Sequence, residues 1–165
     1  PRLTAIISTD DGDVRASIVE SVSFPGACQA GVGSPVALQD LPTSWTQAQV
    51  ALRMSTSLTP IVRWESLGGL SLLAQIPIAS AQSHPDVVAL GVAIEESGTE
   101  LIEALARTDS ARAASATLGL HHSTVQVRQA RLEQLLGFKV GTAEGRTRLM
   151  IALALHRLTT PNSIG

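Results

Sequence analysis

The side chains with the clearest chemical pattern belong to a helix predicted over residues 122–136. Thr124, Arg128 and Arg131 follow one another at intervals of four and three residues, so they share one helix face. A second polar stripe beside it consists of His122, Gln126 and Gln129. Arg and Gln side chains read guanine and adenine edges, while hydroxyls and free amides at a helix N-terminus bind phosphates. This pattern favours recognition of double-stranded DNA in its major groove.

Two helices joined by a sharp turn are predicted to position these side chains. The alanine-rich residues 110–118 form the first helix, because small side chains allow a close crossing over a neighbour. Gly119 then reverses the chain at positive φ, and Leu120 is expected to fill the angle between the helices. The second helix stops at Gly137, a suitable residue after a helix C-terminus. The stripe predicted to face the core is Val125, Leu132, Leu135 and Leu136.

Eight residues of this segment are predicted to contact DNA bases or phosphates: Arg112, His121, His122, Ser123, Thr124, Gln126, Arg128 and Arg131. Further candidates for phosphate contact are Arg146 and Arg148. Two alternatives stay open. Arg128 and Arg131 would form a solvated face if they pair with acids such as Glu133, and His121 would simply cap the helix if its position beside the turn is structural.

The charge is distributed unevenly along the chain, although the formal net charge is only −2. Residues 1–106 hold four arginines against eleven acids, a net charge of −7, whereas residues 107–165 hold eight cations against three acids, a net charge of +5. Such asymmetry is typical of a protein with a polyanion-binding end. The alternative is that the two halves attract each other.

Length and composition indicate an ordinary globular chain. It has 165 residues, 17.2 kDa and 44% hydrophobic residues, enough for one domain or two small ones. No apolar run reaches the roughly 18 residues of a membrane span, and no leader pattern opens the chain, so we expect a cytoplasmic protein without a membrane partner. Cys28 is the single cysteine, which excludes a disulfide framework. A start at Pro1 suggests a fragment or a processed product.

The predicted fold class is α+β, with an α/β part over residues 1–78 and an all-helical part over 79–165. Strand-like runs lie at residues 3–8, 27–36 and 60–64, and helical patterns between them lie at 14–22, 42–54 and 70–75. Thr43 or Ser44 is the expected cap of the 42–54 helix, and Trp45 and Trp64 are expected in the core. Helices of the second part are predicted at 87–93, 100–107 (capped by Thr99), 110–118, 122–136 and 144–158.

The run from Leu118 to Val125, with Arg128 and Gly137, resembles the C-terminal helix-turn-helix of the PucR/CdaR family of bacterial transcriptional regulators. Residues that match the family pattern are His121, Thr124, Arg128 and Gly137, whereas His122, Ser123 and Val127 replace its usual Arg, Asn and Tyr. These replacements concern base preference more than the docking mode. Upstream segments that resemble the family's degenerate GGDEF-like domain are residues 31–33, 44–48 and 64–68.

The resemblance implies a partial GGDEF-like module followed by a Fis-like, all-α DNA-binding domain. It also implies control of a catabolic or metabolic operon, with a small-molecule effector bound outside this chain. Because one small helix-turn-helix buries little surface, a homodimer on paired half-sites is expected. The main alternative is a protein-interaction module whose helix-turn-helix no longer binds DNA. A Fis-type domain of an enhancer-binding activator is a narrower alternative, but it leaves residues 28–70 unexplained, where no ATPase motif occurs.

Enzymatic activity is not expected. Asp10, Asp11 and Asp13 follow a predicted strand and have the chemistry to hold Mg²⁺ in a cyclase-like site, yet acid-rich turns after strands are common and no Gly-Gly-Asp/Glu-Glu-Phe string occurs. A diguanylate-cyclase-type enzyme would need that signature upstream of the chain. Adjacent His121 and His122 point about 100° apart on a helix, so neither a metal site nor a cofactor is predicted.

Overall fold

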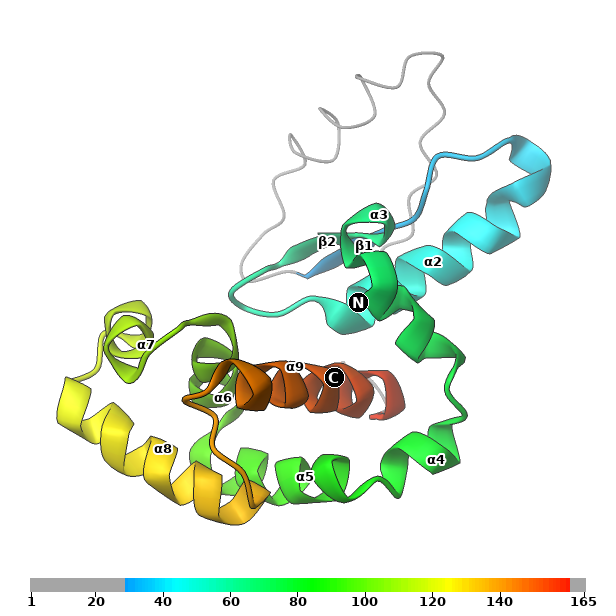
Figure 1. Ribbon diagram of the computed structural model, residues 1–165. Coiled ribbons are helices and arrows are strands. Elements are labelled where there is room, and N and C mark those ends of the chain that lie inside the picture. Colours follow the sequence, from blue (N-terminus) through cyan, green and yellow to red (C-terminus); the bar gives the residue numbers. More distant parts are fainter. Residues whose placement is uncertain (1–28, 161–165) are drawn as a thin grey trace. The chain divides into compact units, whose positions relative to one another are not determined.

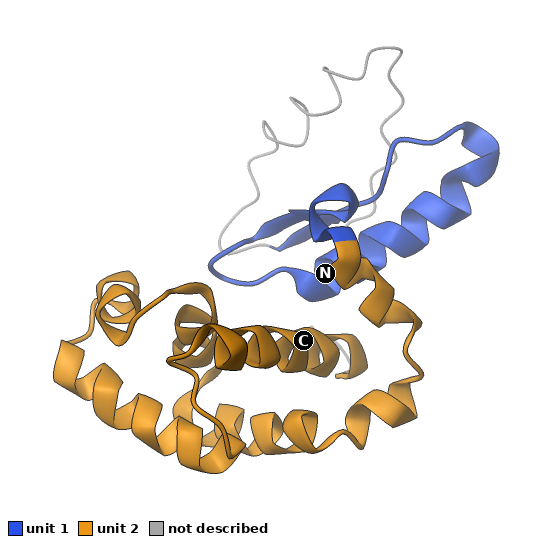
Figure 2. Ribbon diagram, viewed as in Figure 1, with its two compact units in different colours: residues 1–68, 162–165 blue, residues 69–161 orange. Residues whose placement is uncertain are grey.

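The computed structural model describes residues 29–160, which fall into two compact units (Figures 1 and 2). Of the described residues, 29–68 belong to unit 1 and 69–160 belong to unit 2. The predicted strand over 3–8, the acidic turn and the helix over 14–22 lie outside the described residues. The division at Gly68–Gly69 rests on compactness. The proposed boundary between family domains at residues 78 and 79 stays a prediction.

Among residues 29–68, unit 1 is built on two parallel strands joined by a helical crossover. Strand β1 (Ala30–Val32) pairs with β2 (Ile61–Arg63), with Gly31 opposite Val62. Parallel strands require such a crossover, and α2 (Leu41–Met54) supplies it after a short 3-10 turn, η1 (Leu38–Asp40). The backbones of β1 and α2 approach so closely that a Cβ on Gly31 would overlap the carbonyl of Ala48. Glycine is therefore required at this crossing.

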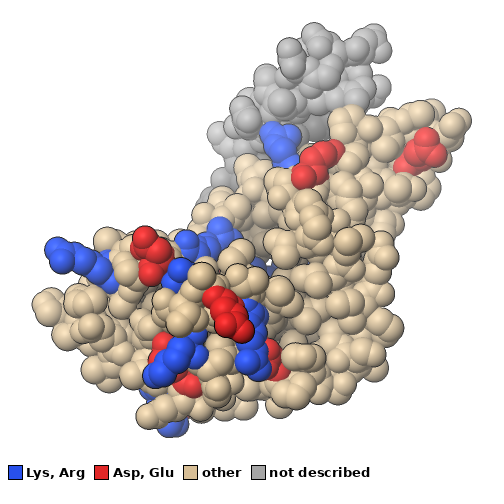
Figure 3. Space-filling model, in the orientation of Figure 1, with Lys and Arg blue, Asp and Glu red and all other residues tan. Residues whose placement is uncertain are grey.

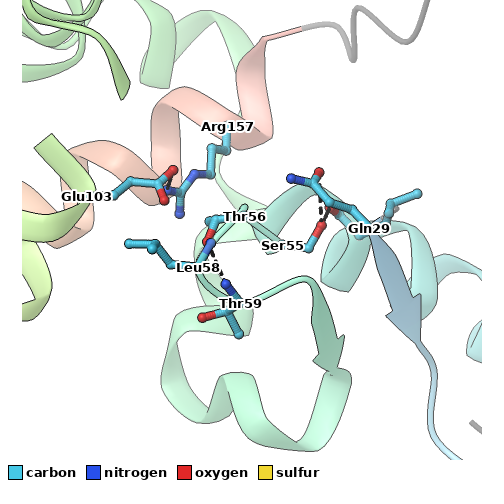
Figure 4. Close-up of polar contacts among 8 residues, drawn as sticks. Gln29, Ser55, Thr56, Leu58, Thr59, Glu103 and Arg157 are labelled. Atoms are coloured by element: carbon cyan, nitrogen blue, oxygen red, sulfur yellow. Dashed lines mark hydrogen bonds and ion pairs between the residues drawn. The ribbon is translucent and has the colours of Figure 1, made fainter. Parts of the chain in front are cut away.

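Side chains at the exit of α2 shape the turn into β2. The Thr56 hydroxyl accepts hydrogen bonds from the Leu58 and Thr59 amides at 3.1 and 3.0 Å, and the Ser55 hydroxyl donates to the Gln29 amide oxygen at 3.3 Å (Figure 4). These local bonds fix the direction in which the chain enters β2.

Three expectations for unit 1 were wrong. Helix α2 begins at Leu41 after Asp40, without a side-chain cap, and the Ser44 hydroxyl instead donates to the Ser34 carbonyl at 2.7 Å. Trp45 is 46% exposed rather than part of the core, because the buried residues of α2 are Ala51 and Met54, which lie about 120° and 180° around the helix from Trp45. Trp64 is half-buried and opens a short helix, α3 (Trp64–Leu67), rather than closing the strand.

Unit 2 is entirely helical within its described residues. Its elements, after the 3-10 segment η2 (Gly68–Gln75), are α4 (Ile78–Gln82), α5 (Pro85–Ser97), α6 (Thr99–Arg107), α7 (Ala111–Leu118), α8 (His122–Leu136) and α9 (Ala143–Thr159). The five helices predicted from residue 87 onward are confirmed. Thr99 is the first residue of α6 rather than its cap, because Gly98, at φ +80°, occupies the cap position. The expected helix over 70–75 is 3-10.

The core of unit 2 lies where α5, α6, α8 and α9 meet. Helix α9 packs against α4, α5 and α6, while α8 packs against α5 and α7 (Figure 1). The largest fully buried side chains are Leu90, Ile102, Val125, Leu132, Val140 and Leu149. An ion pair at 2.6 Å joins Arg157 on α9 to Glu103 on α6 (Figure 4). The periodic apolar residues of each helix thus meet in one core and hold α8 against the body of the unit.

A second ion pair fixes the start of α5 against α9. Two of the three guanidinium nitrogens of Arg148, Nε and Nη2, donate to the buried Asp86 carboxylate at 2.6 and 2.7 Å. The guanidinium carbon lies 4.3 Å from the centre of the Phe138 ring. The hydrogen bond from Arg148 holds the pKa of Asp86 below its usual range, against the opposing effect of burial. This pair links segments 62 residues apart.

Asp86→Asn is expected to lower the Tm by a few degrees at neutral pH, because Arg148 loses its bidentate, charged hydrogen-bond partner. The native pKa of Asp86 is lowered, so its stabilisation is complete above the ordinary aspartate pKa and disappears as the pH falls through the lowered one. Thermal unfolding of both proteins from neutral to strongly acidic pH checks this. A difference in Tm that stays constant into strong acid would contradict the role of the carboxylate.

Within the described range, no helix is sufficiently long and apolar to cross a membrane.

Candidate nucleic-acid interface

Helices α7 and α8 are joined by a glycine turn, and local hydrogen bonds close both ends of α7. Ser110 caps α7 by accepting the Ala113 amide at 3.2 Å. At the other end Gly119 has φ +64°, and the Leu120 amide donates to the Ser115 carbonyl at 3.0 Å, as in a Schellman motif. Figure 1 shows the result, with α7 seen nearly end-on and α8 crossing beside it. The predicted left-handed glycine is confirmed, but Leu120 is 37% exposed and does not fill the angle between the helices.

His121 forms the N-terminal cap of α8. Its Nδ1 atom accepts from the Ser123 amide at 3.4 Å and lies 2.8 Å from the Ser123 hydroxyl. When Nδ1 accepts in this way, the neutral ring carries its proton on Nε2. The capping alternative for His121 is therefore what the structure shows, and its contact with DNA stays a prediction.

The two sides of α8 differ as the sequence pattern predicts. Val125 and Leu132 are fully buried and Leu136 is buried beside them, whereas Leu135 is half-buried. The exposed predicted contact residues of the helix are His122, Ser123, Thr124, Gln126, Arg128 and Arg131. Gln129 is half-buried and turned toward Glu133, to which it donates at 3.0 Å. The helix thus presents one polar face away from the core.

Glu133, the one acid of α8, belongs to the turn that follows the helix. Its side chain is only 9% exposed and accepts hydrogen bonds from Gln129 and from the Val140 amide, both at 3.0 Å, with Lys139 Nζ at 2.8 Å. Burial raises the pKa of Glu133, but these hydrogen bonds together lower it below its usual range. This carboxylate therefore stabilises residues 139–140 rather than neutralising the arginines of the exposed face.

Arg131 makes an ion pair with α5. Its Nε and Nη2 atoms donate to the two carboxylate oxygens of Glu96 at 2.6 and 3.1 Å, with both side chains partly exposed. The hydrogen bond from Arg131 lowers the pKa of Glu96. The sequence interpretation missed Glu96, because a residue 35 positions upstream leaves no local spacing signal. In this arrangement two of the five donor hydrogens of Arg131 are already engaged.

The remaining cations of this region fall into two groups. Arg146 Nη1 donates to the carbonyls of Gly141 and Asp109 at 2.8 and 3.3 Å, and Arg148 is engaged by Asp86. Arg112 and Arg128 are exposed and form no ion pair within residues 29–160. On the face seen in Figure 3, Lys and Arg atoms are concentrated over unit 2, with acidic groups among them. Arg112 and Arg128 are thus the cations best placed to meet an external anion.

The outermost face of α8 holds residues that the sequence interpretation did not select. Val127, Ala130 and Gln134 are exposed and lie opposite the buried stripe, together with Ser123. At 100° per residue, Val127 lies about 160° around the helix from Val125. The signal that could have identified Val127 is an apolar residue at a position that helical spacing places opposite the buried stripe. No group of three or more metal-ligating side chains occurs in the described part of the chain.

Two helices joined by a left-handed glycine, the second of them capped and polar on its outer side, define a helix-turn-helix domain. Residues 100–155 match the family model of the PucR C-terminal helix-turn-helix domain, which spans all of this arrangement from the start of α6 into α9. The predicted resemblance is confirmed for this segment. The match does not include residues 1–99, so the GGDEF-like interpretation of residues 1–78 stays a prediction.

No curated protein and no solved structure matches the chain. The family model therefore supplies the class of the matched segment alone, that of a PucR-type helix-turn-helix domain.

Proposed function

We propose that this chain binds double-stranded DNA by inserting α8 into the major groove, as the C-terminal region of a PucR-type transcription regulator. The observation that carries the proposal is the exposed surface of α8, which lies within the matched helix-turn-helix segment and includes Arg128, a cation without an ionic partner in the described range. Arg112 on α7 adds a second such cation. Phosphate contacts from these arginines supply affinity, and the polar side chains of α8 read base edges.

In this proposal the residues divide by role. The first turn of α8 meets phosphates and the nearest bases through the exposed side chains of His121, His122, Ser123 and Thr124, because the positive end of the helix dipole attracts anions. Gln126 reads a base edge, and Arg112 and Arg128 bind phosphates of the DNA backbone. Arg131 contributes only when DNA competes with Glu96 for its guanidinium.

In the cell, we propose that this regulator is cytoplasmic, non-enzymatic and free of cofactors. It controls a catabolic or metabolic operon in response to an effector sensed outside this chain. A homodimer on paired half-sites supplies the affinity that a single small module lacks. The upstream residues 1–78 form the partial GGDEF-like module of this regulator.

The proposal is tested by titrating the protein against a labelled random duplex pool over a salt series. Counterion release predicts a linear fall of log affinity with log salt, and Arg112→Gln/Arg128→Gln should make the slope less steep by about 1.8, about 0.9 for each lost phosphate contact. Arg53→Gln removes one equal charge outside the matched segment and should leave the slope nearly unchanged. A folded dimer, enforced if necessary by a fused coiled coil, that binds no duplex at low salt would refute the proposal.

A protein-interaction module is the second candidate. The ion pair between Arg131 and Glu96 favours it, because it occupies a cation that a DNA-reading helix would otherwise present. In that case the double variant and Arg53→Gln would behave alike toward DNA, and neither would show counterion release.

A further inference from the structure

Val127 is an apolar side chain placed at the centre of a polar face. It is 71% exposed, on the part of α8 farthest from the core. Its neighbours on this face are Ser123 one turn before it and Ala130 one turn after it, and both are exposed. Single exposed apolar residues are common on protein surfaces, so the exposure alone says little. The position within the proposed interface is what gives it meaning.

The charges around Val127 indicate what covers it. Arg128 follows it directly and makes no ion pair within residues 29–160, and Arg131 lies one turn further along the helix. No acid of α8 itself shares this face, since Glu133 is turned into the α8–α9 turn, and the Glu96 carboxylate of α5 is engaged by Arg131. This pairing leaves Arg128 as the cation available to a ligand, and a cation is complementary to a polyanion rather than to an apolar protein surface.

The major groove of DNA presents one apolar group, the C5-methyl of thymine, beside its hydrogen-bond donors and acceptors. Valine offers no donor or acceptor, so it discriminates only through this methyl. Because it projects opposite the buried stripe, Val127 lies deepest where α8 meets the base edges, and Ala130 leaves room beside it. Resting on the proposed function, we propose that Val127 contacts a thymine methyl and selects thymine at one position of each half-site.

The test begins with duplexes enriched by the wild-type protein from a random pool. Each thymine of the enriched site is then replaced in turn by deoxyuridine, which removes only the methyl. At one position per half-site the wild type should lose affinity by about three- to tenfold, whereas Val127→Ala should lose little on the same replacement. Val127 is exposed, so its truncation leaves the core of unit 2 intact.

Val92→Ala provides the matched control, since Val92 is an exposed valine on α5, outside the helix-turn-helix. This variant should keep the full deoxyuridine penalty of the wild type. If deoxyuridine is tolerated at every position of an enriched site, or if Val127→Ala retains the penalty, the thymine contact is wrong while the proposed function stands. If no duplex is enriched at all, the proposed function fails and this inference fails with it.

Discussion

Gly145→Ala is expected to destabilise unit 2 by about 2 kcal/mol, although helix propensity alone predicts a gain of about 1 kcal/mol. Gly145 is the third residue of α9 and is buried. Its amide donates to the Thr142 hydroxyl at 3.0 Å, and a Cβ added there would overlap the backbone carbonyl of Lys139. Because that obstacle is backbone, relief requires the α8–α9 turn to move.

Gly91→Ala is the control for this prediction, because Gly91 lies in the middle of α5. The nearest atom to an added Cβ, Nε2 of His156, is 4.0 Å away, an ordinary contact distance. This substitution should raise the free energy of unfolding by about 0.5–1 kcal/mol. Equilibrium denaturation of both variants checks the opposite signs. If Gly145→Ala is neutral or stabilising, the close approach of the turn to α9 is not present in solution.

Glu96→Gln is expected to tighten DNA binding about fivefold at low salt and to steepen the salt dependence by about 0.9, the value for one added phosphate contact. In the free protein the Glu96 carboxylate holds Nε and Nη2 of Arg131. A glutamine has the same shape but no charge, so it competes less strongly with a phosphate for the guanidinium. The gain should appear on random duplexes as well as on selected sites, because phosphate contacts carry no sequence information.

Glu95→Gln is the control, because it removes the same charge one residue away on α5. The Glu95 side chain is exposed and forms no ion pair within the described residues. It should change affinity less and leave the slope close to that of the wild type. The two variants are compared by fluorescence anisotropy over the same salt series. Equal behaviour of both would show that only net charge matters and that the Glu96–Arg131 pair does not restrain Arg131.

Most of the helix-turn-helix was predictable from local signals. The left-handed conformations of Gly119 and Gly137 and the buried stripe of α8 follow from residue type and helical spacing. These features depend on neighbours within about one turn, which sequence patterns reach directly. The same rules failed at Ser44 and Thr99, because each residue stands one or more positions inside its helix rather than before it.

The sequence by itself determined the helices of unit 2, the glycine turn and which side of α8 faces outward. Only the tertiary structure decided which arginines of α8 and α9 form ion pairs with acids. Packing of α5 against α8 brings Glu96 to Arg131, and packing of α5 against α9 brings Asp86 to Arg148. The physical reason is the distance along the chain over which each kind of signal acts. Periodicity constrains residues within a turn or two of each other, whereas an ion pair between residues 35 or 62 positions apart depends on how whole helices pack.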